Sequence, residues 1–173
     1  MRSSATVLLF VLCCFGAWAT SVGPPIRIDV AAPTHEQPVT AAMVILDAKG
    51  SNAVRRGEHC VVWVRVRILP LFHIYGLNKS GTDNAPTRLK LAFPKGVKAV
   101  RDWTAQGEPK KAGKALIYEE EITFVTTLMV GKKTPQGKHA INCQIEYQVC
   151  NEELCWPPAK IDLAAEVEVV ALN

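Results

Sequence analysis

The 173-residue sequence predicts an all-β fold, an antiparallel β-sandwich, on three observations. Short segments alternate apolar and polar residues, as strands with one buried face do. Clusters rich in Gly, Pro, Asn and Asp separate these segments. No segment sustains a helical apolar period between recognisable caps. About seven to nine short strands joined by such turns are typical of an immunoglobulin-like sandwich.

Residues 1–19 have the features of a signal peptide. Met1 and Arg2 give a basic start, Ala5–Phe15 is apolar, and small residues occupy Ala17 and Ala19. This apolar stretch is short for a bilayer span, and no later window approaches the required length. The mature chain is therefore predicted to be soluble and periplasmic or otherwise extracytoplasmic, without stable membrane insertion.

The alternative is a lipid anchor on Cys13 or Cys14, although Leu12 is a poor residue to precede a modified cysteine. Removal of a signal takes two of the six cysteines with it. Four cysteines in an oxidising compartment favour disulfides, with three connectivities open. The four are Cys60, Cys143, Cys150 and Cys155.

Residues 20–38 contain four prolines and are predicted to be an extended leader, which leaves residues 39–173 as the domain. The clearest strand is Cys60–Ile68, whose even-numbered residues are apolar. The predicted strands are Val39–Leu46, Cys60–Ile68, Arg88–Phe93, Val97–Trp103, Leu116–Val125, Ala140–Val149 and Ile161–Val169. The predicted connections are Asp47–Asn52, Pro94–Gly96, Gln106–Lys114 and Thr134–Gly137.

Charge and motifs exclude several function classes. The formal net charge is only +4, and Lys and Arg occur singly or in pairs, so no nucleic-acid partner is predicted. Nothing resembles a Ser/His/Asp set, a phosphate-binding glycine loop or a paired-carboxylate site. His59 and Cys60 are adjacent, but no second close pair stands at ligand spacing, so neither a metal nor another cofactor is predicted.

Cys150 and Cys155 lie in a short connection between two strongly patterned strands. A disulfide between them would close a very small loop and stabilise the fold by only about 2 kcal/mol. A bond that contributes so little is suited to being opened and closed. The spacing alone leaves two interpretations open, a redox-active pair and an ordinary structural clip.

Four segments of the chain resemble the N-terminal periplasmic domain of the thiol:disulfide interchange protein DsbD. The most specific is GKHAINCQIEYQVCNEELCWPPAKIDL, which resembles the last hairpin of that family. The others are RILPLFHIYGLN and APTRLKLAFPKGV, which resemble its central strands, and AGKALIYEEEITF, which resembles the strand after its cap loop. Together they cover most of residues 40–170.

The resemblance implies an immunoglobulin-like domain that accepts electrons from a membrane-linked thioredoxin-like partner. Such a domain passes them to exported oxidoreductases and to proteins of cytochrome c biogenesis. Cys150 and Cys155 match the exchanging pair, and Cys155 matches the cysteine that forms mixed disulfides. Tyr75 matches an aromatic residue flanking the site, and Gly113 a glycine that ends the cap loop.

Two departures from the family pattern accompany this match. The corresponding cap, Glu108–Ala112, has no aromatic side chain to shield a disulfide. The sequence also lacks a thioredoxin-like domain and a membrane span after residue 170. We therefore expect a free-standing carrier, served by a separate membrane electron transporter, or a relative with a changed role.

The neighbours of the cysteine pair suggest how it would react. Glu152 and Glu153 should disfavour a thiolate, so the partner would need to bring an activated thiol. Pro157 and Pro158 remove two amide donors and keep the loop from pairing as a plain strand. Tyr147 precedes the pair, and Trp156 is read first as a packing residue that could also contact a docking partner.

Cys60 and Cys143 fall on the apolar faces of two predicted strands. They could form a structural disulfide between sheets or remain as two buried thiols. The sequence therefore predicts a thiol–disulfide exchange protein with thioredoxin-like redox partners. The alternative is an immunoglobulin-like binding or adhesion module whose disulfides are purely structural.

Overall fold

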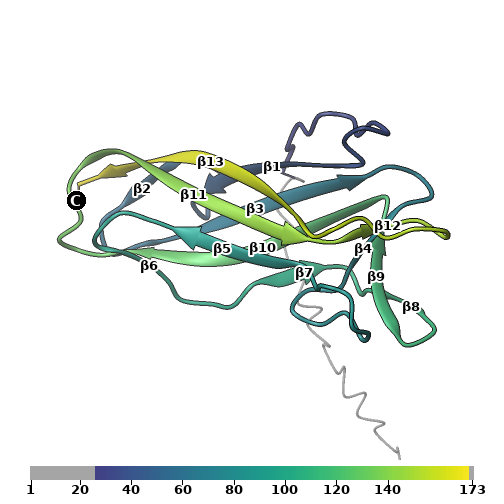
Figure 1. The fold of residues 1–173 in the computed structure, drawn as a ribbon. Helices are drawn as coiled ribbons and strands as arrows, with labels where there is room; N and C mark the ends of the chain where they lie inside the picture. The colour runs from purple at the N-terminus through teal and green to yellow at the C-terminus, as the bar shows by residue number, and fades with distance from the viewer. Residues whose placement is uncertain (1–25, 172–173) are drawn as a thin grey trace, which may run out of the picture.

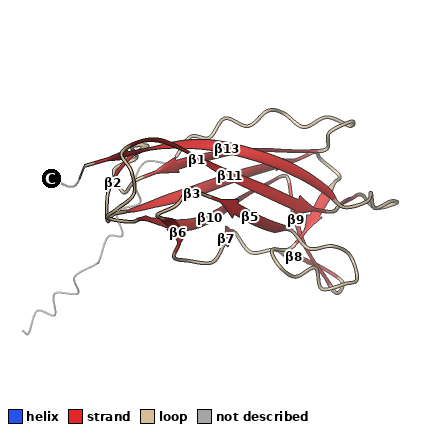
Figure 2. Ribbon diagram, turned by 60° about the vertical axis from the view of Figure 1, so that its left-hand side comes forward, coloured by secondary structure: helices blue, strands red, loops and turns tan. Residues whose placement is uncertain are grey.

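A computed structural model describes residues 26–171. The predicted signal peptide at residues 1–19 lies outside the described residues. The described part of the chain is all-β, with thirteen strands and no helix, as the red strands and tan loops of Figure 2 show. The predicted all-β class and immunoglobulin-like sandwich are confirmed.

Two larger sheets, A and B, form the body of the sandwich (Figure 1). All strand pairs are antiparallel except β2 with β13. Sheet A contains β1 (Val39–Leu46), β3 (His59–Ile68), β10 (Glu121–Val130), β6 (Val97–Ala99) and β7 (Thr104–Gln106). Sheet B contains β2 (Ala53–Arg55), β13 (Ala159–Val170), β11 (Gly137–Tyr147) and β5 (Arg88–Ala92).

The core lies between these sheets and follows from the alternation of apolar residues along each strand. Every second residue of β3, from Cys60 to Ile68, is at most 2% exposed. Phe124 of β10 and Ile141 of β11 are fully buried among them. Each such side chain contributes about 1.5–3 kcal/mol when it is removed from water, so this interior holds the fold together.

A third, smaller sheet C closes the end of the body far from the C-terminus (Figure 1). Because successive residues of a strand point to opposite faces, its two faces differ. Ile74, Tyr118 and Val149 join the main core, whereas Tyr75 and Cys150 pack in a separate cluster on the other face. The strands of sheet C are β12 (Val149–Cys150), β4 (His73–Tyr75), β9 (Ala115–Glu119) and β8 (Lys110–Ala112).

Sheet C accounts for the main differences from the predicted strands. The single strand predicted at Leu116–Val125 is two strands, because Glu120 has a φ of +59° and turns the chain from sheet C into sheet A. The predicted loop Gln106–Lys114 contains β8, which is fully exposed and lacks an apolar pattern. The short strands β2, β4 and β7 are also absent from the prediction.

The described part of the predicted leader, residues 26–38, has no regular secondary structure but lies against sheet A. Ile28 is 5% exposed, and its carbonyl accepts a hydrogen bond from Arg65 of β3. The Ala31 carbonyl accepts another from the hydroxyl of Thr40. These contacts hold the segment along β1 and β3. No helix in residues 26–171 is long and apolar enough to cross a membrane.

Candidate functional site

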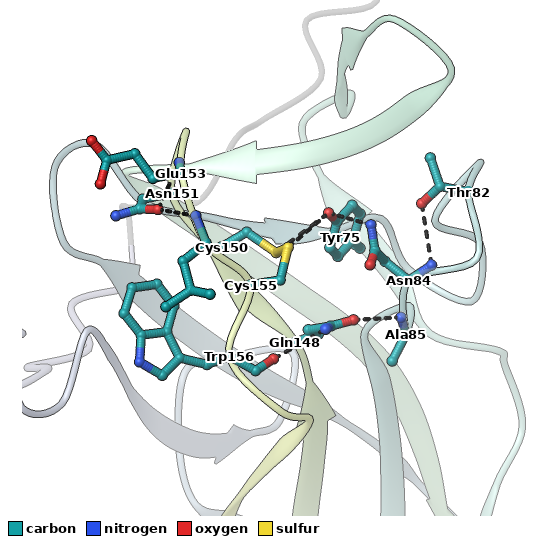
Figure 3. Close-up of a disulfide and its surroundings, with 11 residues drawn as sticks. Tyr75, Thr82, Asn84, Ala85, Gln148, Cys150, Asn151, Glu153, Cys155 and Trp156 are labelled. Carbon is teal, nitrogen blue, oxygen red and sulfur yellow. Dashed lines mark hydrogen bonds between the residues drawn. A yellow bond between two sulfur atoms is a disulfide. The ribbon is translucent and has the colours of Figure 1, made fainter.

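Cys150 and Cys155 form a disulfide at the end of the sandwich, beside sheet C, with a Cα–Cα distance of 4.1 Å (Figure 3). β12 places Cys150 directly opposite His73 of β4. The chain then reverses, because Asn151 N donates to the Leu154 carbonyl and Trp156 N donates to the Val149 carbonyl. The result is a tight hairpin that carries one cysteine on each arm.

Asn151 fixes the tip of this hairpin. Its side-chain oxygen accepts hydrogen bonds from the amides of Glu153 at 3.0 Å and Leu154 at 2.7 Å. Asn commonly stabilises turns in this way. The carboxylates of Glu152 and Glu153 lie in the exposed tip, close in sequence to both cysteines. The turn therefore brings the two cysteines together and leaves the two acidic residues in its exposed tip.

The two cysteines of the pair differ in exposure. Cys150 is 1% exposed and packs with Tyr75 and Ile117, whereas Cys155 is exposed to solvent. Attack on a disulfide sulfur requires access to that sulfur. The difference in exposure makes Cys155 the more accessible residue of the pair.

Tyr75 of β4 lies directly beside the disulfide. Its hydroxyl oxygen is 3.4 Å from Cys150 Sγ and 3.7 Å from Cys155 Sγ. Burial raises the pKa of the Tyr75 hydroxyl, so this group stays protonated. The phenol is the polar group in contact with both sulfurs (Figure 3).

Asn84 was not identified from the sequence. It lies in the connection between β4 and β5, and its side-chain nitrogen donates to the Tyr75 hydroxyl at 2.6 Å. The next residue, Ala85, donates its amide to Gln148, and the other end of the Gln148 side chain donates to the carbonyl of Trp156. Gln148 thereby ties the Asn84 segment to the cysteine hairpin. An Asn in a loop without alternation carries no signal that would have found it.

The β8–β9 hairpin stands where the sequence predicted a cap. Gly113 occupies its two-residue turn with a φ of +62°, a conformation that glycine adopts without strain. Ala112 and Ala115 are paired across the hairpin on the face that carries Tyr75. These small side chains leave Cys155 exposed.

Trp156 directly follows Cys155 in the sequence. The Trp156 ring packs against Phe72 with centroids 5.3 Å apart, and about a third of its surface is exposed. Leu71, next to Phe72 in the sequence, and Leu154, next to Cys155, are also exposed apolar residues. Pro157 is exposed next to Trp156. Tyr147, by contrast, is buried in the main core, outside the cluster of Cys150.

Cys60 and Cys143 are free thiols, so the structural disulfide considered for them is not formed. Cys60 belongs to β3 of sheet A and Cys143 to β11 of sheet B, and each is about 1% exposed. Both fill apolar positions, where a thiol packs as a small hydrophobic group. Burial raises the pKa of Cys60 to about 11 and that of Cys143 to about 12, and Asp47 adds to the effect on Cys60. These two thiols are therefore unreactive near neutral pH.

His73 of β4 also lies near the pair. It stands opposite Cys150 and packs edge-on against Tyr75, with ring centroids 5.5 Å apart. Burial lowers its pKa, and the opposing effect of Glu119 is smaller. Within residues 26–171, no three His, Cys, Asp or Glu side chains are grouped to hold a metal ion.

No protein-family model matches the sequence, and no curated protein matches it. Among solved structures, the N-terminal periplasmic domain of ScsB from Proteus mirabilis is similar, with 10% identity and a TM-score of 0.50. The match covers 80% of this chain and 49% of the ScsB chain, so this chain spans about half of that length.

Two further structures are similar at lower scores. The DsbD N-terminal domain of Neisseria meningitidis is 18% identical with a TM-score of 0.34, and the match covers 62% of this chain and 77% of the DsbD chain. The major pilin subunit BcpA of Bacillus cereus is 9% identical with a TM-score of 0.46, covering 78% and 41% of the two chains. At the identity of the ScsB match the likeness concerns the fold, and the chain has the fold of that periplasmic domain.

Proposed function

We propose that this protein is an extracytoplasmic thiol–disulfide exchange protein that carries electrons through Cys150 and Cys155. The observation that carries the proposal is the asymmetry of the bonded pair at the end of the sandwich, in which the residue Cys155 is exposed and the residue Cys150 is 1% exposed. The fold shared with a periplasmic domain supports it. So does the sequence resemblance of the cysteine hairpin to the DsbD family.

Exchange would proceed in two steps. The thiolate of a reduced thioredoxin-like partner attacks Cys155 Sγ, a mixed disulfide forms, and the electron pair of the broken S–S bond passes to Cys150 Sγ. The second thiol of the partner then releases Cys155 and leaves the partner oxidised. The reduced pair repeats the process in reverse on the disulfide of an exported client, with Cys155 attacking and Cys150 resolving.

The charges around the pair favour a partner that supplies its own activated thiol. Glu152 and Glu153 lie between the cysteines and disfavour a thiolate on Cys155. A thiol that stays protonated attacks slowly at neutral pH. Reduction by a low-pKa thiolate of a thioredoxin-like protein would avoid this barrier, and such proteins, together with a separate membrane electron transporter, are the proposed partners.

Trapping of mixed disulfides tests the proposal. A Cys150→Ser variant with a reduced Cys155 thiol is mixed with a thioredoxin-like protein that keeps only its attacking cysteine, activated as a mixed disulfide with a small aromatic thiol. A covalent complex through Cys155 should accumulate as the small thiol leaves, because neither protein then holds a second thiol to resolve it. A Cys155→Ser variant should accumulate at least about tenfold less, since its remaining thiol is buried. Both variants are compared in a chain that lacks residues 1–19 and carries Cys60→Ala and Cys143→Ala, which leaves a single thiol in each.

Equal trapping by the two variants would contradict the assignment of Cys155. Absence of any complex, together with a reduction potential of the pair below about −300 mV, would instead favour an immunoglobulin-like binding module with a structural clip.

A further inference from the structure

The hydrogen bond from Asn84 determines where the proton of the Tyr75 hydroxyl points. Asn84 Nδ2 donates to Tyr75 Oη at 2.6 Å, so that oxygen is the acceptor in this contact. A hydroxyl has one proton, which it can then offer to a different acceptor. The remaining partners of Tyr75 Oη are Cys150 Sγ at 3.4 Å and Cys155 Sγ at 3.7 Å. The amide thus turns the O–H of Tyr75 toward the disulfide (Figure 3).

We infer that Asn84 is a positioning residue, and that the Tyr75 hydroxyl it orients donates a hydrogen bond to the Cys150 sulfur when the disulfide is cleaved. The inference rests on the proposed function, in which Cys150 is the leaving group. When a thiolate attacks Cys155 Sγ, the electron pair of the S–S bond moves to Cys150 Sγ. The Tyr75 O–H is already in place to stabilise the negative charge that develops there.

Burial makes this donor necessary. Cys150 is 1% exposed, so water has almost no access to its sulfur. A thiolate released in an apolar cluster without a hydrogen-bond donor would be strongly disfavoured. The phenol replaces the missing solvent. Its proton stays on oxygen, because a phenol is a weaker acid than a thiol and burial raises the pKa of Tyr75 further.

The charged groups around Cys150 do not supply an alternative. His73, directly opposite on β4, has a pKa lowered by burial and is neutral near pH 7. Lys110 of β8 is hydrogen-bonded to Glu119 of β9, so its charge is already paired. Glu119 itself would repel a thiolate. Among the described groups on β4, β8 and β9, the Tyr75 hydroxyl is therefore the donor placed to meet the sulfur.

Asn84 is held in place independently of Tyr75. Its backbone amide donates to the hydroxyl of Thr82, and the amide of Ala85 donates to Gln148. The segment also packs closely on the β8–β9 turn, where a Cβ on Gly81 would lie 2.0 Å from the Lys114 carbonyl oxygen. The Asn84 side chain is thus presented to Tyr75 by a fixed loop before any partner binds.

The first test removes the hydroxyl. In Tyr75→Phe, the pKa of the Cys150 thiol, followed by thiolate absorbance in a reduced Cys155→Ser background, should rise by about one. Reduction of the disulfide by dithiothreitol and by reduced thioredoxin should slow about three- to tenfold. Tyr118→Phe is the matched control, since Tyr118 is buried in the main core, and it should leave both readouts unchanged. Unchanged values in Tyr75→Phe would overturn the inference.

The second test reverses the polarity of the positioning residue. Asn84→Asp replaces the donor with a carboxylate that accepts the Tyr75 proton and turns it away from sulfur, so it should slow reduction as much as Tyr75→Phe does. Asn84→Ala should slow it about two- to threefold. In the Tyr75→Phe background, Asn84→Ala should not slow reduction further. Asn84→Asp should slow it only by the repulsion between its carboxylate and the charge that develops on Cys150. Full effects of either substitution in that background would overturn the role of Asn84.

The dithiothreitol arm separates this inference from the proposed function. If the Tyr75 and Asn84 variants alter the Cys150 pKa and reduction by dithiothreitol while no thioredoxin-like protein forms a mixed disulfide, the proposed function fails and the inference stands. If mixed disulfides form at unchanged rates in the variants, the proposed function stands and the inference fails.

Discussion

Cys60 and Cys143 lie within the body of the sandwich, whereas Cys150 and Cys155 lie at its end beside sheet C. The first two are separate thiols surrounded by apolar side chains, and burial keeps them protonated. The other two are bonded, and Cys155 is an exposed residue whose sulfur lies next to a phenol hydroxyl. The comparison teaches that surroundings, and not residue type, separate buried free thiols from a bonded pair at the surface.

The largest expected effect separates the two regions by stability. Phe124→Ala in β10 should lower the free energy of unfolding by about 3–5 kcal/mol, because this side chain is fully buried in the body. Replacing Cys150 and Cys155 together with Ala should cost only about 2 kcal/mol, since their loop is so short. Chemical denaturation with matched m-values measures both. If replacing the cysteine pair lowered the free energy of unfolding more than Phe124→Ala does, the Cys150–Cys155 disulfide would be a structural bond.

An intermediate effect is expected from Cys60→Ala with Cys143→Ala, which should cost about 1 kcal/mol at each site near neutral pH. Because burial raises both pKa values from 9.0, the stabilisation by the protonated thiols is complete below about pH 9 and is lost as the pH rises towards about 11 or 12. The unfolding free energy of the wild type should thus fall more steeply with pH than that of the double variant. Parallel pH profiles would show that these thiols are not desolvated.

The smallest effect on stability is expected from Trp156→Ala. This side chain is partly exposed and packs on Phe72, a contact worth about 1 kcal/mol. The same substitution should slow exchange with a thioredoxin-like protein several-fold while leaving reduction by dithiothreitol unchanged, because a small reductant does not need an apolar surround. If Trp156→Ala slowed reduction by dithiothreitol as much as exchange with the thioredoxin-like protein, Trp156 would affect the reactivity of the disulfide and not the docking of a partner.

The body of the sandwich could be predicted from sequence because burial imposes a period of two. β1 has the bounds predicted from its apolar and β-forming residues, and β3, predicted from alternation, differs from the prediction by one residue at its start. Sheet C could not be predicted in this way. Its strands have two to five residues, too few for a period to be recognised, and β8 is exposed throughout.

The residues of the candidate site were likewise predicted only in part. The pairing of Cys150 with Cys155 was implied by the resemblance of the hairpin, whereas the residues alone left three connectivities open. Asn84 and Gln148 were not, since their contribution depends on a connection between β4 and β5 that folds back onto the cysteine hairpin. Only the three-dimensional arrangement brings an amide, a phenol and two sulfurs from three separate segments into contact.

The position of Trp156, next to Cys155 in sequence and packed on Phe72, should make its fluorescence sensitive to the disulfide. An indole emits fluorescence, and a nearby disulfide quenches that emission more strongly than a pair of thiols does. Trp156 is adjacent in sequence to Cys155 and held by an aromatic contact, so its brightness should follow the oxidation state of the pair. Trp63 and Trp103 belong to the region of sheet A and would contribute a steady background. Reduction of the Cys150–Cys155 disulfide should therefore be visible in real time without an attached dye.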